Sequence, residues 1–201
     1  GIAGDGVREY RGIPFAAPPV GPLRFAPPAP PASWTGVLDA TRVRAACPQA
    51  RRFGLTEASE VEDCLHLNLA VPTAPHAGPR PVLVWFYGGA FVGGSTRLYP
   101  LEFLARESDL VVVSVNYRLG PLGFMAHPAF AAEANGGYAL EDQRAALRWV
   151  QQNIAAFGGD PGNVTVFGES AGGQSVLALF ASPKARGLFH RGIAQSPYGI
   201  P

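Results

Sequence analysis

The segment "TVFGESAGGQ", residues 165–174, places strand-forming residues directly before a turn of small residues. The run that ends at Phe167 leads into Gly-Glu-Ser-Ala-Gly, residues 168–172, which has the spacing Gly-x-Ser-x-Gly. In that motif the serine stands on a sharp turn between a strand and a helix, with its hydroxyl exposed. The motif alone is a weak signal, because short patterns of common residues recur by chance. The flanking sequence therefore decides how Ser170 is interpreted.

Both flanks favour a strand–turn–helix. "NVTVFG" (163–168) predicts a buried strand, and "SAGGQSVLALFAS" (170–182) predicts a helix. Gly168 and Gly172 leave no side chain where the turn brings the backbone close to strand and helix. The serine hydroxyl would lie at a helix N-terminus, where free N–H groups favour developing negative charge. We interpret Ser170 as a nucleophile; an ordinary serine that caps the helix is the alternative.

The rest of residues 81–201 alternates strands with helices. Short apolar runs rich in β-branched and aromatic residues predict strands buried on both faces. These runs are "VLVWFY" (82–87) and "LVVVSVN" (110–116), and "RGIAQS" (191–196) predicts a last short strand. Helical spacing occurs in "LYPLEFLARES" (98–108) and "LEDQRAALRWVQQNIAAF" (140–157). The alternation predicts right-handed crossovers and a mostly parallel α/β sheet.

Proline-rich sequence dominates the first 80 residues. Proline lacks the N–H that a ladder or a helix interior needs, so this region is expected to wrap irregularly over the core. Recurring large apolar residues indicate that the wrap is packed: Phe15, Leu23, Phe25 and Trp34. The alternating "CLHLNLAV" (64–71) predicts a half-buried edge strand. Residues 1–201 are thus predicted to be the amino-terminal portion of one domain, with a wrap and edge strand in 1–80 and a βαβ core in 81–201.

A second glycine-rich turn follows a predicted strand in "WFYGGAFVGG" (85–94). Small residues at Gly88, Gly89 and Ala90 allow backbone N–H groups to point at a ligand, as stabilisation of a tetrahedral oxyanion requires. The N–H of Ala171, just after the serine, would be a further donor. The alternative is a plain turn between strand and loop.

Composition excludes several classes of function. A formal net charge of +1 argues against a nucleic-acid partner, and no run of 18 apolar residues predicts a membrane span. Neither a nucleotide-binding lysine motif nor an organic cofactor is indicated, and a metal site of Cys47, Cys64 and His66 lacks a fourth ligand. The two cysteines can form a disulfide after export or remain thiols in the cytosol. No leader opens the sequence, so secretion and a cytoplasmic location both stay open.

Taken together, these segments resemble the amino-terminal part of type-B carboxylesterases, the cholinesterase-like family that includes p-nitrobenzyl esterases and has the α/β-hydrolase fold. The matching stretches follow the family's order and cover nearly the whole chain. They are "YRGIPFAAPPVGPLRF" (10–25), "EDCLHLNL" (62–69), "VWFYGGAFVGG" (84–94), "VSVNYRLGPLGF" (113–124), "LEDQRAALRWVQQNIAAFGGDPGNVTVFGESAGG" (140–173) and "LFHRGIAQS" (188–196).

The resemblance implies a role for individual residues. It implies Ser170 as the nucleophile of a carboxylic ester hydrolase, and Gly89, Ala90 and Ala171 as oxyanion-hole donors. Glu169 also matches the family, where a carboxylate can orient water or support an imidazolium; a structural ion pair is the alternative. Further pairings are implied by position: a short-loop disulfide of Cys47 with Cys64, and ion pairs of Arg24 with Glu62 and of Arg118 with Asp142.

Partners for the serine are the missing part of this prediction. A serine nucleophile needs a base, usually a histidine held by a carboxylate, and in α/β-hydrolases both follow the serine in the chain. After Ser170 the sequence has no Asp or Glu, and its only later histidine is His190. Three earlier histidines are interpreted as packing or surface residues: His66, His76 and His127. We therefore expect the acid and the histidine in a downstream segment or a second chain.

Three functions remain in competition. The leading one is hydrolysis of a small ester through an acyl-enzyme on Ser170. The others are a non-catalytic cholinesterase-like binding domain and an inactive truncated product. The intact serine, glycines and oxyanion loop favour the first. The apolar residues Phe91, Leu122 and Phe124 are candidates for a substrate wall or for the core.

Overall fold

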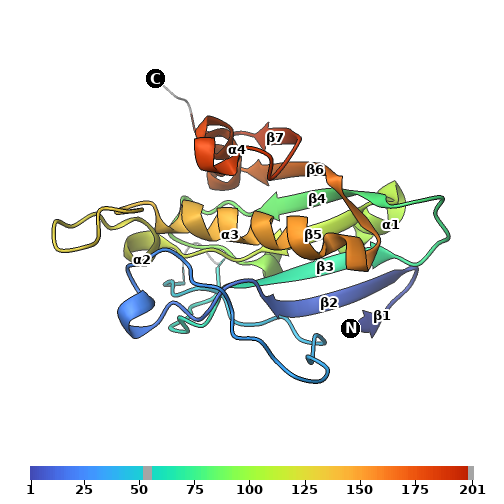
Figure 1. The fold of residues 1–201 in the computed structure, drawn as a ribbon, viewed down its shortest axis with the longest axis horizontal. Coiled ribbons are helices and arrows are strands. Elements are labelled where there is room, and N and C mark those ends of the chain that lie inside the picture. The colour runs from blue at the N-terminus through green and yellow to red at the C-terminus, as the bar shows by residue number, and fades with distance from the viewer. Residues whose placement is uncertain (52–55, 199–201) are drawn as a thin grey trace.

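The computed structural model describes residues 1–51 and 56–198. Within these residues the strands form one seven-stranded sheet in the order β1-β2-β3-β5-β4-β6-β7 (Figure 1). Its strands are β1 (Ile2–Ala3), β2 (Val7–Pro14), β3 (His66–Pro72), β4 (Arg80–Phe86), β5 (Val111–Val115), β6 (Gly159–Glu169) and β7 (Arg191–Gln195).

Helices occupy most of the longer connections after β4. The α-helices are α1 (Glu102–Ser108), α2 (Gly120–Phe124), α3 (Tyr138–Asn153) and α4 (Ala171–Ala181). Short 3-10 turns are η1 (Gly21–Leu23), η2 (Thr96–Leu98), η3 (Ile154–Phe157) and η4 (Pro183–Ala185). Helix α1 packs against β2, β3 and β5, whereas α4 packs against β4, β6 and β7. None of the described helices combines the length and the hydropathy needed to cross a bilayer.

The expected mostly parallel sheet is confirmed in the half that contains β5, β4, β6 and β7. Strands β5, β4, β6 and β7 are mutually parallel, whereas β3 runs antiparallel to β5 and β2 antiparallel to β3. The parallel strands therefore all end at one edge of the sheet, which we call the carboxyl edge. Strand β3 runs opposite to these strands and therefore begins at the carboxyl edge, whereas β2 runs opposite to β3 and therefore ends there. The long connection between Pro14 and His66 thus starts and finishes at the carboxyl edge.

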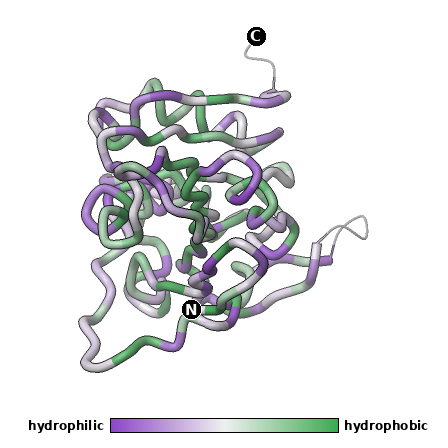
Figure 2. The backbone as a smooth tube through the Cα atoms, turned by 90° about the vertical axis from the view of Figure 1, so that its right-hand side faces the viewer, coloured by the Kyte–Doolittle hydropathy of each residue, from purple (hydrophilic) through white to green (hydrophobic). Residues whose placement is uncertain are grey.

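Apolar strands and one helix face supply the core. Val82, Val84 and Phe86 of β4 are fully buried, and so is every residue of β5 but Ser114, which is 6% exposed. Each buried side chain of this size stabilises the fold by about 1.5–3 kcal/mol. Hydrophobic segments accordingly gather toward the middle of the molecule in Figure 2, with hydrophilic segments mainly outside. The predicted helix over 140–157 is confirmed as α3 and η3, and it stops at Gly158, whose φ is 79°.

The first 80 residues contribute more to the sheet than their proline content indicates. Strand β2 pairs with β3 along most of its length, so β3 lies inside the sheet and the prediction of an edge strand there is wrong. The sequence pattern does not predict strand β2, because charged residues interrupt it and its register shifts between Tyr10 and Ile13. The wrap is packed at Phe15, which is 4% exposed, but not at Trp34, which is 49% exposed.

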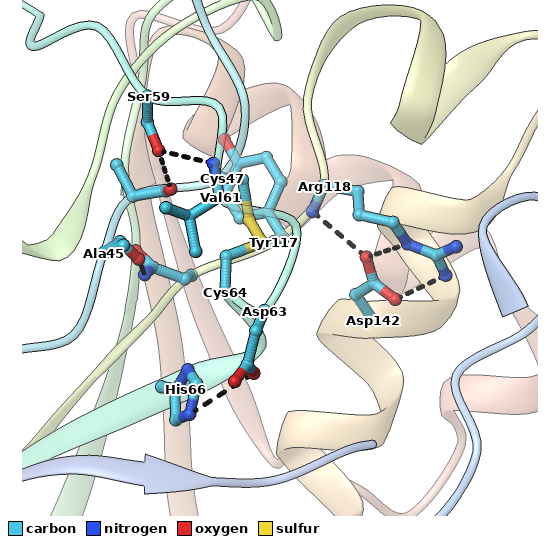
Figure 3. Close-up of a disulfide and its surroundings, with 12 residues drawn as sticks. Ala45, Cys47, Ser59, Val61, Asp63, Cys64, His66, Tyr117, Arg118 and Asp142 are labelled. Atoms are coloured by element: carbon cyan, nitrogen blue, oxygen red, sulfur yellow. Dashed lines mark hydrogen bonds and ion pairs between the residues drawn. A yellow bond between two sulfur atoms is a disulfide. The ribbon is translucent and has the colours of Figure 1, made fainter. Parts of the chain in front are cut away.

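Three predicted pairings are present in the structure, and Figure 3 shows two of them, the disulfide and the ion pair of Arg118 with Asp142. Cys47 and Cys64 form a disulfide, so their sulfur atoms are not available as metal ligands with His66. Arg118 donates three hydrogen bonds to Asp142, from its backbone N, Nε and Nη2 at 2.7–3.0 Å. Burial raises the pKa of Asp142, and these bonds from Arg118 oppose the shift. Arg24 forms the expected bidentate pair with Glu62 through two bonds of 2.7 Å.

Candidate active site

Ser170 stands between the end of β6 and the start of α4, at the carboxyl edge. Its backbone has φ 56° and ψ −119°, a region that non-glycine residues rarely occupy. Such a conformation costs on the order of 1–3 kcal/mol and persists only where the surroundings fix it. The sharp turn predicted from Gly-x-Ser-x-Gly is therefore present, and its strain falls on the serine itself.

The glycines of the motif allow this turn to form against neighbouring strands. A Cβ at Gly172 would lie 1.9 Å from the carbonyl oxygen of Phe86, the last residue of β4. A Cβ at Gly168 would lie 2.5 Å from the carbonyl of Gly172. On the other side, the Ser170 N–H donates to the carbonyl of Gln195 at the end of β7 (2.9 Å). The turn is thus held between β4 and β7, with no room for larger side chains.

The Ser170 hydroxyl is not used to cap α4. The helix has no side-chain capping bond at its N-terminus, although Ser170 is the N-cap residue. Ser170 is partly exposed, and Ala171 is the first helical residue, whose N–H has no partner inside the helix. A hydroxyl oxygen that does not cap the helix and a free backbone donor are therefore adjacent at this position.

The loop of residues 88–94, which we call the oxyanion loop after the role predicted for it, lies directly beside this turn. A Cβ at Gly88 would be 2.7 Å from the carbonyl oxygen of Glu169 and 3.0 Å from Cβ of Ser170. Gly88 is buried, whereas Gly89 and Ala90 are exposed. Among the described residues, the N–H groups of Gly89 and Ala90 have no hydrogen-bond acceptor. The loop therefore offers two donors next to the serine.

The loop has an unusual backbone conformation. Gly89, Ala90 and Phe91 have φ values of 122°, 54° and 61°, so two residues with side chains adopt the left-handed region. A Cβ at Gly89 would lie only 2.0 Å from the carbonyl oxygen of Gly93, which explains why glycine is required there. The Gly89 carbonyl accepts from the N–H groups of Val92 and Gly93 at 3.0 and 3.1 Å, which closes the loop on itself.

Glu169 is exposed beside Gly88 and the serine. Its charge contributes to raising the pKa of Tyr99, after burial, which is the larger cause; a backbone hydrogen bond with Gly88 acts in the opposite direction. None of the ion pairs among the described residues includes Glu169. Its carboxylate thus acts on this part of the sheet edge through its field.

Two buried tyrosines below the loop were not singled out by sequence reasoning. Tyr87 lies between the end of β4 and the oxyanion loop, and Tyr117 follows β5. Their rings stack with centroids 4.5 Å apart. Burial raises the pKa of both hydroxyls far above the usual range. A tyrosine shortly beyond the end of each of two neighbouring parallel strands would have been the signal for such a contact.

Apolar residues adjoin the loop on its far side. The Phe91 and Phe124 rings are in contact, with centroids 4.9 Å apart, and the Gly120 N–H donates to the Phe91 carbonyl (2.7 Å). With Val92, Pro121 and Met125 they line an apolar pocket of about 480 Å³. Leu122 is partly buried and is not part of that lining.

None of the four histidines lies beside Ser170. His190 precedes β7 and is bonded to Val164 through both its backbone N–H and its ring, where Nδ1 accepts from the Val164 N–H (3.1 Å). Five residues of extended β6 lie between Val164 and Ser170, so six residue steps separate the two by roughly 20 Å. His190 is thus excluded as the base by the length of the strand.

The remaining histidines are engaged elsewhere. His66 begins β3 at the carboxyl edge, but β5 and β4 separate it from β6, which places it about 14 Å away across the sheet. His76 bonds to the carbonyl of Gly78, and His127 accepts from the N–H of Ala129. In the part of the chain that the structure describes, Ser170 therefore has no histidine partner.

This arrangement of strand, serine turn and glycine loop is matched by known proteins. A sequence model described as "Carboxylesterase family" matches residues 2–200. The chain belongs to the carboxylesterase family. It is 48% identical over 202 residues to a para-nitrobenzyl esterase of Bacillus subtilis, covering 98% of this chain and 41% of that protein. It is 50% identical over 206 residues to a human cocaine esterase, covering 96% of this chain and 36% of that protein.

Solved structures agree with this assignment. A thermophilic PNB esterase superposes on this carboxylesterase-family chain with a TM-score of 0.90 at 48% identity, over 97% of this chain and 42% of the other. A second PNB esterase gives 0.88 at 49% identity, over 98% and 42%. The expected α/β-hydrolase fold is therefore confirmed. The chain spans about two fifths of the length of these relatives.

Proposed function

We propose that this carboxylesterase-family chain carries the nucleophile and the oxyanion hole of a serine esterase. The observation that carries the proposal is the contact between Gly88 and Ser170, where a Cβ at Gly88 would lie 3.0 Å from Ser170 Cβ. This contact sets the donors of the oxyanion loop beside an uncapped serine hydroxyl. Relatives named para-nitrobenzyl esterase and cocaine esterase support esters as the substrate class.

The proposed reaction proceeds in two halves. Ser170 Oγ attacks the ester carbonyl carbon while a base removes its proton. The carbonyl oxygen becomes an oxyanion that accepts hydrogen bonds from the N–H groups of Gly89, Ala90 and Ala171. The carbon–oxygen bond to the alcohol then breaks, and the alcohol leaves with a proton. Water repeats the attack on the acyl-enzyme, which releases the carboxylic acid and restores Ser170.

Electrostatic stabilisation of the oxyanion is expected to be a large part of the rate enhancement. Each such donor is typically worth about 2.7–4 kcal/mol of transition-state stabilisation. Ala171 contributes in addition the positive end of the α4 dipole. Gly88 is assigned a packing role, because it is buried and its backbone already interacts with Tyr99. Glu169 is proposed to stabilise a positively charged base by its negative field.

The base and its carboxylate are proposed to come from chain outside residues 1–201 or from a second chain. The positions of His66 and His190 support this, because neither can reach the serine. A direct test is hydrolysis of p-nitrophenyl acetate by residues 1–201 alone. We expect a rate equal to that of Ser170→Ala; a much higher rate would mean that this segment contains a base of its own.

Covalent labelling tests the function as a whole. A fluorophosphonate should label the full-length protein at Ser170 and stop ester hydrolysis, and Ser170→Ala should abolish both. Ser182→Ala is the matched control: it changes a serine at the other end of α4, where Oγ accepts from Arg144 (2.8 Å), and should keep labelling. If Ser170→Ala kept both activity and labelling, the proposal would be rejected. Absence of both in the wild type would favour the non-catalytic binding domain or the inactive product.

A further inference from the structure

The oxyanion loop is fastened at its far end by a side chain from a distant part of the sequence. Gln49 Nε2 donates to the carbonyl of Gly94 (2.9 Å), and Gln49 Oε1 accepts from the Gly94 N–H (2.8 Å). The same Nε2 also reaches the carbonyl of Cys47 (3.2 Å). One amide group therefore satisfies both backbone groups of the last loop residue.

Gly94 in turn fixes the start of the loop. Its φ is 126°, and a Cβ there would lie 2.6 Å from the Gly88 carbonyl and 2.5 Å from Cδ2 of Tyr87. Holding Gly94 therefore also holds Gly88, which packs against Ser170. Displacement of Gly94 would be transmitted to the two donors, Gly89 and Ala90, that lie between these ends.

Gln49 is itself held in a rigid setting. It lies two residues after Cys47, inside the segment closed by the Cys47–Cys64 disulfide. Its backbone exchanges two hydrogen bonds with Ser59, each 2.9 Å. Ser59 is held in turn by its hydroxyl, which donates to the Ala46 carbonyl (2.7 Å; Ser59 is labelled in Figure 3). The side chain thus presents its amide from a fixed support.

The strain of the loop gives this contact a function. Ala90 and Phe91 both have positive φ, and such residues keep their conformation only where surrounding contacts over-determine it. The loop's own bonds, from Val92 and Gly93 to Gly89, close it but do not fix it to the rest of the molecule. Gln49 supplies such an external contact at one end of the loop.

We propose that Gln49 is a positioning residue for ester hydrolysis: it acts through Gly94 to hold the N–H groups of Gly89 and Ala90 where the oxyanion forms. The inference rests on the proposed function of the serine site. Gln49 touches neither substrate nor reacting atoms. Removal of the Gln49 amide should therefore weaken stabilisation of the transition state more than binding of the ground-state substrate.

Gln49→Met in the full-length protein tests this, because it keeps the length of the side chain and removes its amide. Gln151→Met is the matched control: Gln151 Nε2 also bridges two backbone carbonyls, those of Pro161 and Leu188 (2.9 and 3.0 Å), but on α3, away from the loop. We expect Gln49→Met to lower kcat about tenfold, since small displacements of catalytic groups cost this much or more. KM should change less than about twofold, and Gln151→Met should leave both near wild type.

A trifluoromethyl ketone inhibitor gives a readout that a merely structural role would not move. Its adduct with Ser170 carries an oxyanion, so its affinity should fall in Gln49→Met in proportion to kcat and stay unchanged in Gln151→Met. If Gln49→Met does not fold, Gln49→Glu retains the acceptor for Gly94 N–H and should show a smaller loss of the same kind. Equal kcat and inhibitor affinity in wild type and the Gln49 variants would overturn the inference. A wild type that hydrolyses no ester through Ser170 would instead overturn the proposed function on which it rests.

Discussion

The hydroxyl of Tyr117 donates a hydrogen bond to the main-chain carbonyl of Tyr87 (2.6 Å), and the hydroxyl of Tyr87 bonds in return to the main chain of Tyr117. Both side chains are fully buried. The carbonyl of Tyr87 belongs to the peptide that contains the N–H of Gly88. The end of β4 is therefore fixed to the end of β5 immediately before the oxyanion loop begins.

Tyr117→Phe should destabilise the fold and slow ester hydrolysis. The substitution leaves the buried Tyr87 carbonyl without its closest donor, which costs about 1–3 kcal/mol of unfolding free energy. We expect kcat to fall several-fold, because the start of the loop gains freedom. Urea denaturation and steady-state kinetics of the full-length protein measure the two effects. Tyr87→Phe, which removes only bonds of 3.2 and 3.3 Å, serves for comparison and should have the smaller effect on both.

Gly172→Ala should disrupt the serine turn. The added methyl group would lie 1.9 Å from the Phe86 carbonyl, so either β4 or α4 must move. We expect a loss of stability of about 1–3 kcal/mol, typical of overpacking, together with loss of fluorophosphonate labelling. Gly4→Ala is the control, because its nearest new contact is 3.5 Å, an ordinary distance. Wild-type labelling of Gly172→Ala would contradict the geometry assigned to the turn.

Removal of the disulfide should affect both stability and rate. Replacement of Cys47 and Cys64 by serine opens a loop with a sequence separation of 17, for which the chain-entropy account predicts a loss of about 3 kcal/mol. Because Gln49 lies in this loop, kcat should fall as well at temperatures where the variant stays folded. Thermal denaturation under oxidising and reducing conditions measures the first effect, and kinetics in the same buffers measure the second. A wild type whose melting temperature is insensitive to reductant, with thiols shown to be reduced, would count against this expectation.

Acidification should destabilise the protein in part through His66. Burial, as the larger cause, and Arg44 lower the pKa of His66 below its ordinary value of 6.5, while Asp63 opposes the shift. The unfolded chain therefore binds more protons than the folded chain just below pH 6.5, so the stability from this group is present above that pH and declines as pH falls toward the lower folded pKa. His66→Gln should reduce the slope of unfolding free energy against pH just below pH 6.5. Denaturation curves at several pH values measure it; identical slopes in both proteins would refute the assignment.

Much of the fold could be predicted from local patterns. The apolar runs of β4, β5 and β6 and the periodicity of α3 carry their own signal, since burial on both faces or on one helical face leaves a regular trace in the sequence. Strand β2 leaves no such trace. Charged residues interrupt it, and it is stabilised by pairing with β3 across 51 intervening residues of sequence, between Pro14 and His66.

The candidate site likewise has a part that could be predicted from the sequence and a part that could not. Ser170 and its flanking glycines were predicted because a sharp turn dictates residue type at each position of a short motif. The positive φ of Ala90 and Phe91 could not be predicted, because neither residue type favours it and the contacts that impose it come from distant segments. The role proposed for Gln49 depends on a bond to a residue 45 positions away, which no local pattern records.

Because of the direction of the strands, the two edges of the sheet differ in how well they tolerate inserted residues. Short connections, residues 4–6 between β1 and β2 and residues 73–79 between β3 and β4, lie at the edge opposite the serine. Surface loops of this kind accept added residues far better than the elements that they join. An affinity tag, a fluorophore or a whole inserted domain placed within residues 73–79 would therefore remain far from the reacting atoms, whereas the same insertion between Pro14 and His66 would fall among the supports of the loop.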